Sequence, residues 1–555
     1  MIVRCVVESV DTDKGCLFHV MPESVGFQVE EERGPDQTIV RLSVARTAFV
    51  GRTLRGPVNR AVTLHSFTEF QQTFGGLWQP STLGYAVEQF FDNGGLEAVV
   101  VRVVNGARAA TLRLAAGSGT LHLRAVRPGT REFLRASVDY DNIAPTNSVE
   151  FNLTVQRVRT QGTAHVEDQE IYSRLSILPS GERYVGQLLA DSQLVRLEGA
   201  PPAERPNATL SAASGIATRY VACEAGDDGD VLTDYDVIGS EQDRTGLFAL
   251  GAVDHFNFLC IPPLTREQDL SAVTLLVAAQ FCKEHRALFV VDPPSAWHTA
   301  DDALRGLRQW PLASENAIMY FPRILAHDKL RGHFEVFAPC GAVAGMLARS
   351  DEAFPVWGPE KPEDAILRPG FRPVCLVAED RRMRLAAKGV NTIQAVRSAT
   401  RIGVSPRTLA GGVAGSADWQ SLRLRRLTLF ILNSVERGTR WILHSKPHLD
   451  VAELAVAQVS AFLERLHESG AFGDRTRARA YFVVCDDRER ACASNEFQFV
   501  IGLAATGARE FHCFRIVHSV AGSKITPCLN PLNVTNYSPE ELAWVDKLAG
   551  QLLLP

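Results

Sequence analysis

Three residue types that could form a hydrolytic centre lie close together in the sequence. Asp292, Ser295 and His298 fall within the segment Val-Asp-Pro-Pro-Ser-Ala-Trp-His. In a catalytic triad of these types, the aspartate orients the histidine, and the histidine takes the proton of the serine hydroxyl as it attacks an ester or amide. The members of such a triad usually converge in space from distant positions, so closeness in sequence is more typical of a loop after a strand. We therefore expect a loop here and keep a serine-type hydrolase as the alternative.

The other patterns that could carry chemistry are incomplete. Ser405 lies in Gly-Val-Ser-Pro-Arg, which lacks the final glycine of a nucleophile elbow. His444 and His448 are four residues apart, but Pro447 between them disfavours a helical pair of metal ligands. A run of aspartates lacks the spacing and the distal glutamate of an EF-hand; it comprises Asp227, Asp228, Asp230, Asp234 and Asp236. The chain also has no phosphate-binding loop, dinucleotide-binding motif or HExxH motif. We expect no cofactor, no metal and no enzymatic activity.

The composition is that of a folded protein with several domains. The chain has 555 residues, of which 46% are hydrophobic and 22% charged, and a net charge of -5. Its 11 cysteines form no CxxC pair, which favours a reducing cytoplasm. The segment from Met1 to Val20 lacks the pattern of a secretory signal, and no apolar stretch is long enough to predict a membrane span. We expect a cytoplasmic protein without membrane insertion.

Periodicity divides the chain into blocks. In 41–106 a strand at Val44–Val50 precedes a helix that has a capping box at Ser66 and Glu69 and ends at the pair Gly75-Gly76. A second helix and a buried strand follow. Alternating polar and apolar residues in 107–200 predict short β-strands. The residues in 201–370 read as α/β, with strands at Phe256–Ile261 and Ala287–Val291 around a helix. In 371–520 we expect helices at Leu427–Val435 and Val451–Leu466 and strands at Trp441–Leu443, Tyr481–Val484, Phe497–Ile501 and Phe511–Val517.

Charge is distributed unevenly along the chain. The stretch from Val377 to Lys446 contains 13 basic and 4 acidic residues, whereas the stretch from Pro22 to Gln37 contains five acidic residues and one arginine. An acidic arm and a basic body can attract one another, which favours association in a defined orientation. Nucleic-acid binding by the basic stretch is a further alternative, but the whole chain is acidic and the stretch lacks interleaved aromatic residues.

An ordered set of segments resembles the tail sheath proteins of contractile phage tails and related contractile injection systems. The resemblance covers roughly 22–105 and 218–520. Each segment alone is weak evidence for the family, but the ordered set is specific to it. The segments are Thr47–Asn59, Phe67–Phe70, Phe74–Gly76, Leu83–Val87, Phe90–Gly95, Val99–Val103, Asp234–Gly239, Thr245–Leu247, Phe258–Pro262, Ala317–Pro322, Cys340–Ala348, Gly389–Asn391, Arg407–Leu409, Arg425–Leu427 and Ser434–Trp441.

The resemblance implies a multidomain α+β and α/β fold. It implies a sheath core built from N- and C-terminal parts, an inserted β-rich domain and a central α/β domain, likened to subtilisin but non-catalytic. The expected division is an N-terminal extension and arm at 1–40, core at 41–106, an outward-facing insertion at 107–200, the central domain at 201–370, the C-terminal domain at 371–520 and a C-terminal arm at 521–555.

The resemblance also implies a structural role. Sheath subunits stack as hexameric rings in a helical array around an inner tube, contract to drive the tube through a target envelope, and end at baseplate and cap proteins. Their arms add strands to neighbouring subunits, and no nucleic acid is bound. The particle is assembled in the cytoplasm and becomes a phage tail or an extracellular or cell-bound contractile device. The expected arm residues are Phe27, Val29, Glu30, Glu31 and Glu32. The expected contacts with the tube or a neighbour are Arg423, Arg425, Arg426, Arg437 and Arg440.

Overall fold

The structure, a computed structural model, describes most of the chain from Ile39 onward. The described residues are 39–160, 165–209, 220–358, 365–396, 399–402, 406–411, 418–444, 449–485, 497–504, 511–520 and 522–528. The expected arm residues Phe27, Val29 and Glu30 to Glu32 therefore lie outside them, as do Ser405, His448 and 529–555.

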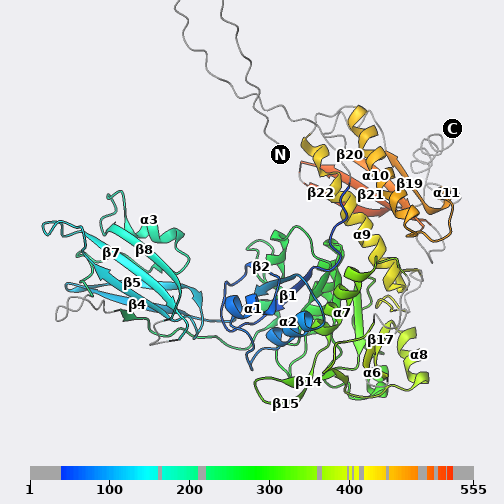
Figure 1. The fold of residues 1–555 in the computed structure, drawn as a ribbon, viewed down its shortest axis with the longest axis horizontal. Helices are drawn as coiled ribbons and strands as arrows, with labels where there is room; N and C mark the ends of the chain where they lie inside the picture. Colours follow the sequence, from blue (N-terminus) through cyan, green and yellow to red (C-terminus); the bar gives the residue numbers. More distant parts are fainter. Residues whose placement is uncertain are drawn as a thin grey trace, which may run out of the picture. The chain divides into compact units, whose positions relative to one another are not determined.

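A mixed sheet of eight strands organises the largest part of the fold (Figure 1). Its central strands are parallel, and the pairs β17–β18 and β2–β3 at its two ends are antiparallel. In sheet order the strands are β18 (Ala399–Ile402), β17 (Val390–Val396), β13 (Ala317–Phe321), β12 (Leu288–Val291), β11 (Phe258–Cys260), β1 (Thr47–Gly51), β3 (Ala98–Arg102) and β2 (Ala61–Leu64).

Helices cover both faces of this sheet, which is why its parallel strands are apolar on both sides. One face packs against α1 (Phe67–Phe74), α2 (Leu83–Asp92) and α7 (Cys340–Ala353), and these helices and strands share one hydrophobic cluster. The other face packs against α4 (Asp234–Ile238), η2 (Gly246–Ala252), α5 (Ala272–Glu284), α6 (Ala300–Gly306) and α8 (Glu379–Ala387). A small antiparallel sheet of β15 (His333–Phe337), β14 (Ile324–Asp328) and β16 (Arg372–Pro373) follows β13.

The order of the strands joins three of the expected blocks in one sheet. β1 of the N-terminal block pairs with β3 and with β11 of the central α/β region, more than 200 residues further along the chain. At the other end of the sheet, β17 and β18 belong to the block expected at 371–520 and continue the sheet from β13. Apolar parallel strands look alike in sequence, so their order could not be read from it.

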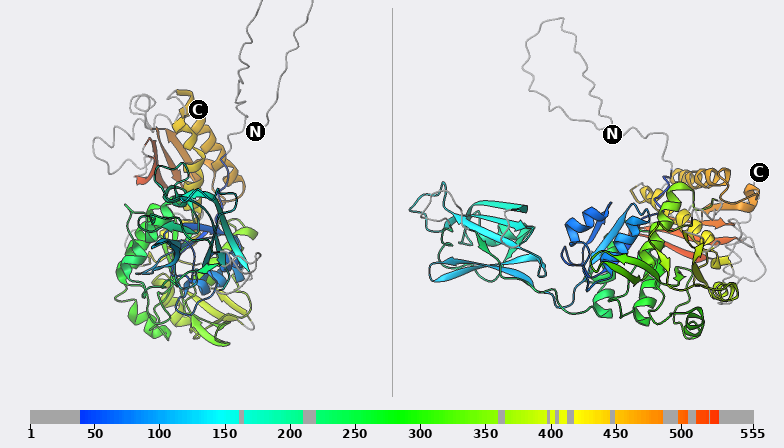
Figure 2. Two further views of the ribbon diagram at one scale, coloured as in Figure 1. Left: turned by 90° about the vertical axis from the view of Figure 1, so that its left-hand side faces the viewer. Right: turned by 60° about the horizontal axis from the view of Figure 1, so that its bottom comes forward.

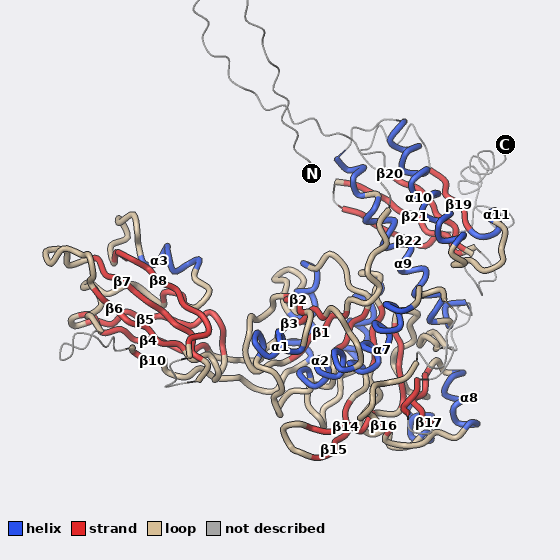
Figure 3. Tube along the Cα trace, viewed as in Figure 1, coloured by secondary structure: helices blue, strands red, loops and turns tan. Residues whose placement is uncertain are grey.

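Most of the regular structure in the inserted region is strand, as its alternation predicts (Figure 3). It contains two antiparallel sheets that enclose a cluster of apolar side chains. One sheet is β10 (Val221–Ala222), β6 (Leu134–Asp139), β7 (Glu150–Val158) and β8 (Val166–Ser176). The other is β4 (Ala109–Ala116), β5 (Gly119–Pro128) and β9 (Val195–Leu197), with the short helices α3 (Val185–Leu188) and η1 (Leu189–Asp191) between β8 and β9.

The C-terminal part combines helices with a four-stranded antiparallel sheet (Figure 2). The sheet order is β19 (Tyr481–Cys485), β20 (Phe497–Leu503), β21 (His512–Ser519) and β22 (Gly522–Cys528). Its helices are η3 (Asp418–Gln420), α9 (Leu422–Gly438), η4 (Arg440–His444), α10 (Leu449–Glu468) and α11 (Arg477–Ala480). The expected strand at Trp441–Leu443 is wrong, because these residues form the 3₁₀ turn η4 directly after α9. A three-residue apolar run does not distinguish a strand from such a turn.

Candidate functional site

The residues of the hydrolase alternative do not converge on a reactive serine. The hydroxyl of Ser295 donates to Asp269 Oδ2 at 2.8 Å. Asp292 Oδ1 accepts instead from the backbone N–H of Cys340, the first residue of α7, at 2.8 Å. Within the described part of the chain, no hydrogen bond joins Ser295 to His298, whose side chain is exposed. A serine nucleophile needs an adjacent base to accept its proton, so this geometry does not activate Ser295.

Asp292 is a buried carboxyl with a structural task. Burial raises the pKa of Asp292 from its ordinary 3.8 to about 6, while the hydrogen bond from Cys340 and the nearby Arg323 oppose that rise. Its Oδ2 atom is buried and has no hydrogen-bond partner. The carboxyl therefore anchors the start of α7 at the end of β12. The free-energy cost of burying it is lower when it carries a proton.

We expect Asp292→Asn to stabilise the protein at pH 8 by about 1–3 kcal/mol and to have little effect at pH 4. The pKa of Asp292 is higher in the folded state, so the cost of burying the charge develops as pH rises from about 4 to about 6 and is complete above that. The amide oxygen of asparagine keeps the bond from Cys340. Urea unfolding at both pH values measures the difference.

The matched control is Asp328→Asn. Burial alone would raise the pKa of Asp328, but hydrogen bonds from the N–H groups of Leu330 and Arg331 and the pair with Arg266 lower it below its ordinary value. Its ionised form is thus stabilised in the folded protein, and the asparagine variant should be less stable at pH 8. Equal effects of the two variants would contradict this account of Asp292.

The aspartate run provides loop contacts. Asp228 accepts from the backbone and hydroxyl of Thr130, Asp234 accepts from Thr274, and Asp236 forms a capping box with Thr233 at the start of α4. Among the described residues, no group of three or more histidine, cysteine, aspartate or glutamate side chains is arranged to hold a metal ion. None of the helices in these ranges is both long and apolar enough to cross a membrane.

The basic residues expected to contact a partner lie on α9 or directly after it. Most of them instead contact groups of the same subunit and so fix the position of α9. Arg423 donates to the carbonyl oxygen of Trp357. Arg425 is buried, donates to Asn316 Oδ1 at 2.6 Å and lies over the ring of Trp419. Burial lowers the pKa of Arg425 to about 10. These two side chains therefore fix the first turns of α9.

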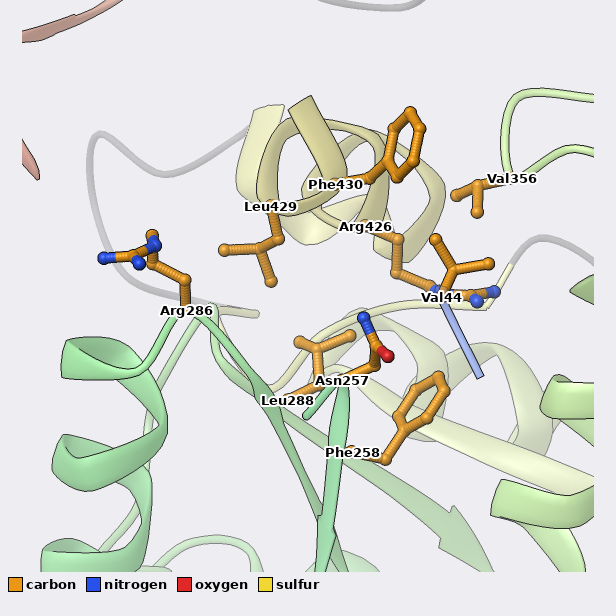
Figure 4. A pocket seen from close by; sticks show the side chains of 9 residues that line it. All are labelled: Val44, Asn257, Phe258, Arg286, Leu288, Val356, Arg426, Leu429 and Phe430. Carbon is orange, nitrogen blue, oxygen red and sulfur yellow. The ribbon is translucent and has the colours of Figure 1, made fainter. Parts of the chain in front are cut away.

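Arg426 forms the most buried of these ion pairs. Its guanidinium pairs with Asp351 of α7, whose side chain is 3% exposed, and lies over the ring of Phe258 in β11. Burial raises the pKa of Asp351 to about 6, and the charge of Arg426 opposes that rise. Figure 4 shows Arg426 beside Phe430 and Val44 at a small cavity of about 20 Å³. That volume admits about one water molecule, so the junction between α9 and the sheet is closely packed.

Arg437 and Arg440, at the end of α9, remain accessible. Arg437 pairs with Asp254 at 2.5 Å, and Arg440 pairs with Asp254 at 3.0 Å and with Glu436 at 2.8 Å. Their side chains are 46% and 44% exposed. Glu436 also pairs with Arg286, which lies in the turn between α5 and β12. Of the five expected arginines, these two present their charge at the surface.

A second feature is the free side of the C-terminal sheet at β22. Within the described residues β22 pairs only with β21, so it ends the sheet. An edge strand offers unpaired backbone groups to another chain. The sequence placed 522–528 in a terminal arm and missed this strand. The signal in the sequence is Gly522, a residue that favours tight turns and here has a φ of 120° opposite Ser519.

Comparison with known proteins gives matches only at the level of structure. No family model and no curated protein matches the sequence. The sheath tail protein from Listeria innocua superposes with a TM-score of 0.58 and 12% sequence identity, over 87% of this chain and 96% of that one. The sheath tail protein from Desulfitobacterium hafniense gives 0.51 and 11%, over 89% and 100%. The sheath of an extracellular contractile injection system, PVC, in its contracted state gives 0.50 and 14%, over 88% and 95%.

These matches define the class of fold. The chain has the fold of tail sheath proteins over most of its length, which confirms at the level of structure the resemblance that the sequence motifs indicate. The solved structures to which it is similar include the two bacterial sheath tail proteins and the sheath of the PVC injection system.

Proposed function

We propose that this protein is a non-enzymatic sheath subunit of a contractile phage tail or contractile injection system. Copies polymerise as a helical stack of hexameric rings around an inner tube and contract to drive the tube through a target envelope. The observation that carries the proposal is the match to sheath proteins over 87–89% of the chain and at least 95% of each matched protein. A head-to-tail contact that does not close generates such a helical array.

The neighbouring copies are joined through arms in this proposal. The acidic arm, with Phe27, Val29 and Glu30 to Glu32, adds a strand to an edge of the C-terminal sheet of the next copy. Strand addition provides main-chain hydrogen bonds and side-chain pockets, and β22 is an edge of the required kind. Arg437 and Arg440 are proposed contacts with the tube or a neighbouring copy, because their side chains are accessible.

The remaining assignments follow the same division of the chain. The central α/β domain serves as a scaffold without catalytic function, and the insertion at 107–200 faces outward, away from neighbouring copies. The partners are other copies, an inner tube protein, and baseplate and cap proteins. Assembly takes place in the cytoplasm, and the finished particle acts outside or at the surface of the cell that made it.

Electron microscopy tests this function. The purified protein, or the protein coexpressed with a candidate tube protein, is expected to form rings or hollow cylinders. Deletion of 22–38, which keeps the buried Ile39, should abolish polymers while leaving a folded monomer, since the arm supplies contacts between copies. Monomers under all conditions, or unchanged polymers after the deletion, would contradict the proposal.

A pair of point variants makes the test specific to strand addition. Val29→Pro removes a backbone N–H from the arm and should weaken assembly, because proline cannot donate to a ladder. Glu31→Gln keeps every backbone group and should assemble, with a weaker dependence on salt. Labelling of Ser295 by a fluorophosphonate probe, lost in Ser295→Ala, would instead favour the hydrolase alternative.

A further inference from the structure

Two cysteines face one another across the last hairpin of the C-terminal sheet. Cys513 in β21 and Cys528 in β22 are direct partners in the antiparallel register. Directly opposed residues in such a pair project their side chains from the same face of the sheet. Their Cα atoms are about 4.5–5.5 Å apart in either kind of antiparallel pair, within the range of about 4.4–6.8 Å that a disulfide bridges.

The surroundings of the two sulfurs support a pair. Cys513 is buried in a small cluster with Phe482, Val484 and Val500, and Cys528 packs against the same cluster. Both are free thiols in the structure, and Cys528 is the more accessible of the two. The side chains thus share one apolar site, open to solvent on the side of Cys528.

We propose that Cys513 and Cys528 form a disulfide under oxidising conditions, which ties the edge strand β22 covalently to β21. The reaction is an exchange with a small-molecule disulfide such as oxidised glutathione. The Cys528 thiolate attacks one sulfur, releases one glutathione thiolate and forms a mixed disulfide. The Cys513 thiolate then attacks the Cys528 sulfur and expels the second glutathione. The two cysteines lose their protons to solvent and are oxidised, and one glutathione disulfide is reduced to two thiols.

The bridge would fix the strand from which the last residues, 529–555, continue. Among the described residues, the reduced β22 pairs on one side only, with β21, so fewer backbone hydrogen bonds hold it than hold a central strand. Oxidised, β22 is tied covalently to β21 at its last residue, Cys528. This inference concerns the subunit alone and does not rest on the proposed assembly.

Burial raises the pKa of Cys513 to about 12 and that of Cys528 to about 11, the latter opposed by Arg515. Thiolate is the attacking species, so we expect the exchange to be slow at neutral pH and to require a long incubation. An accessible cysteine elsewhere would also react with oxidised glutathione, but without a neighbouring thiol it would remain a mixed disulfide.

The test uses the full-length protein incubated with oxidised glutathione to completion. Digestion without reductant should give a linked peptide containing Cys513 and Cys528, with a mass lower by two hydrogens than the separate peptides together. Cys528→Ser should lose this linkage, whereas the control Cys375→Ser, a half-buried cysteine in another part of the fold, should retain it. Peptide mapping of the unaltered chain keeps the test valid if a variant fails to fold.

Three outcomes would overturn the proposal. Recovery of Cys528 as a stable glutathione adduct would show that Cys513 cannot reach it. Linkage of either residue to a different cysteine would show that the register pair is not the preferred one. Recovery of Cys513 and Cys528 as free thiols, at a time when Cys375 is fully oxidised, would show that the site does not react.

Discussion

Replacing Arg426 with alanine is expected to lower the free energy of unfolding by about 3–5 kcal/mol at pH 8. Arg426 pairs with Asp351, and both side chains lie between α9 and α7 with little access to water. Without the guanidinium, the carboxyl of Asp351 is left as a buried charge with its main compensation removed. Arg426 also covers the ring of Phe258, so packing is lost as well. Denaturant unfolding monitored by circular dichroism measures the effect.

The loss should depend on pH in a defined direction. The pKa of Asp351 is already raised to about 6 by burial, against the influence of Arg426, and it rises further when Arg426 is absent. At pH 5 the carboxyl of the variant takes up a proton and is no longer a buried charge. The destabilisation at pH 5 should therefore be smaller than at pH 8. A larger loss at pH 5 would show that the ion pair is not its source.

Two control variants separate the ion pair from a general effect of losing an arginine. Arg384, an exposed residue on α8, should give a change within about 0.5 kcal/mol when replaced by alanine. The double variant Arg426→Met with Asp351→Leu should be more stable than Arg426→Ala alone, because no charge is left buried. If the double variant is as unstable as the single one, packing and not charge is decisive.

Replacing Gly341 with alanine is expected to cost about 3 kcal/mol, at the upper end for overpacked sites. Gly341 and Gly345 lie on the face of α7 that meets α2. A Cβ atom at Gly341 would collide with the carbonyl oxygen of Ala86, and one at Gly345 with that of Phe90. Both obstacles are backbone atoms, so no side-chain rotation relieves the clash and the helices must separate.

Gly251→Ala is the matched control for this prediction. A Cβ atom there meets nothing within 4 Å, and the residue is exposed in η2. Alanine should be neutral or slightly stabilising, because it lowers the entropy of the unfolded chain. Thermal unfolding of the two variants in parallel gives the comparison, and equal shifts in Tm would contradict the close helix contact.

The elements of this protein were predictable where short-range signals specify them. Ser66 caps α1 by accepting from the N–H of Glu69, and Gly75 ends that helix in the left-handed conformation, as the capping motif and the glycine pair indicate. The expected helix at Val451–Leu466 is α10, and the alternation in 107–200 corresponds to the strands of the insertion. The ordered motifs also led to the correct class of fold.

The roles of charged residues were less predictable. A dense basic stretch indicated a surface for a partner, yet Arg425 and Arg426 are directed inward to Asn316 and Asp351. Asp351 precedes the basic stretch and has no feature in sequence that marks it as buried. The proximity of Asp292, Ser295 and His298 was equally uninformative, because Ser295 bonds to Asp269 and Asp292 bonds to the start of α7.

The sequence by itself determined many of the helices and strands, because caps, breakers and apolar periodicity act over a few residues, but it mistook the turn η4 for a strand and missed β22. Only the tertiary structure decided that β1 pairs with β11, that Arg426 meets Asp351, and that Cys513 faces Cys528 across β21 and β22. These contacts depend on which apolar surfaces fit together across long stretches of chain. Many pairings bury a similar area, so the choice rests on packing and charge compensation that no local pattern records.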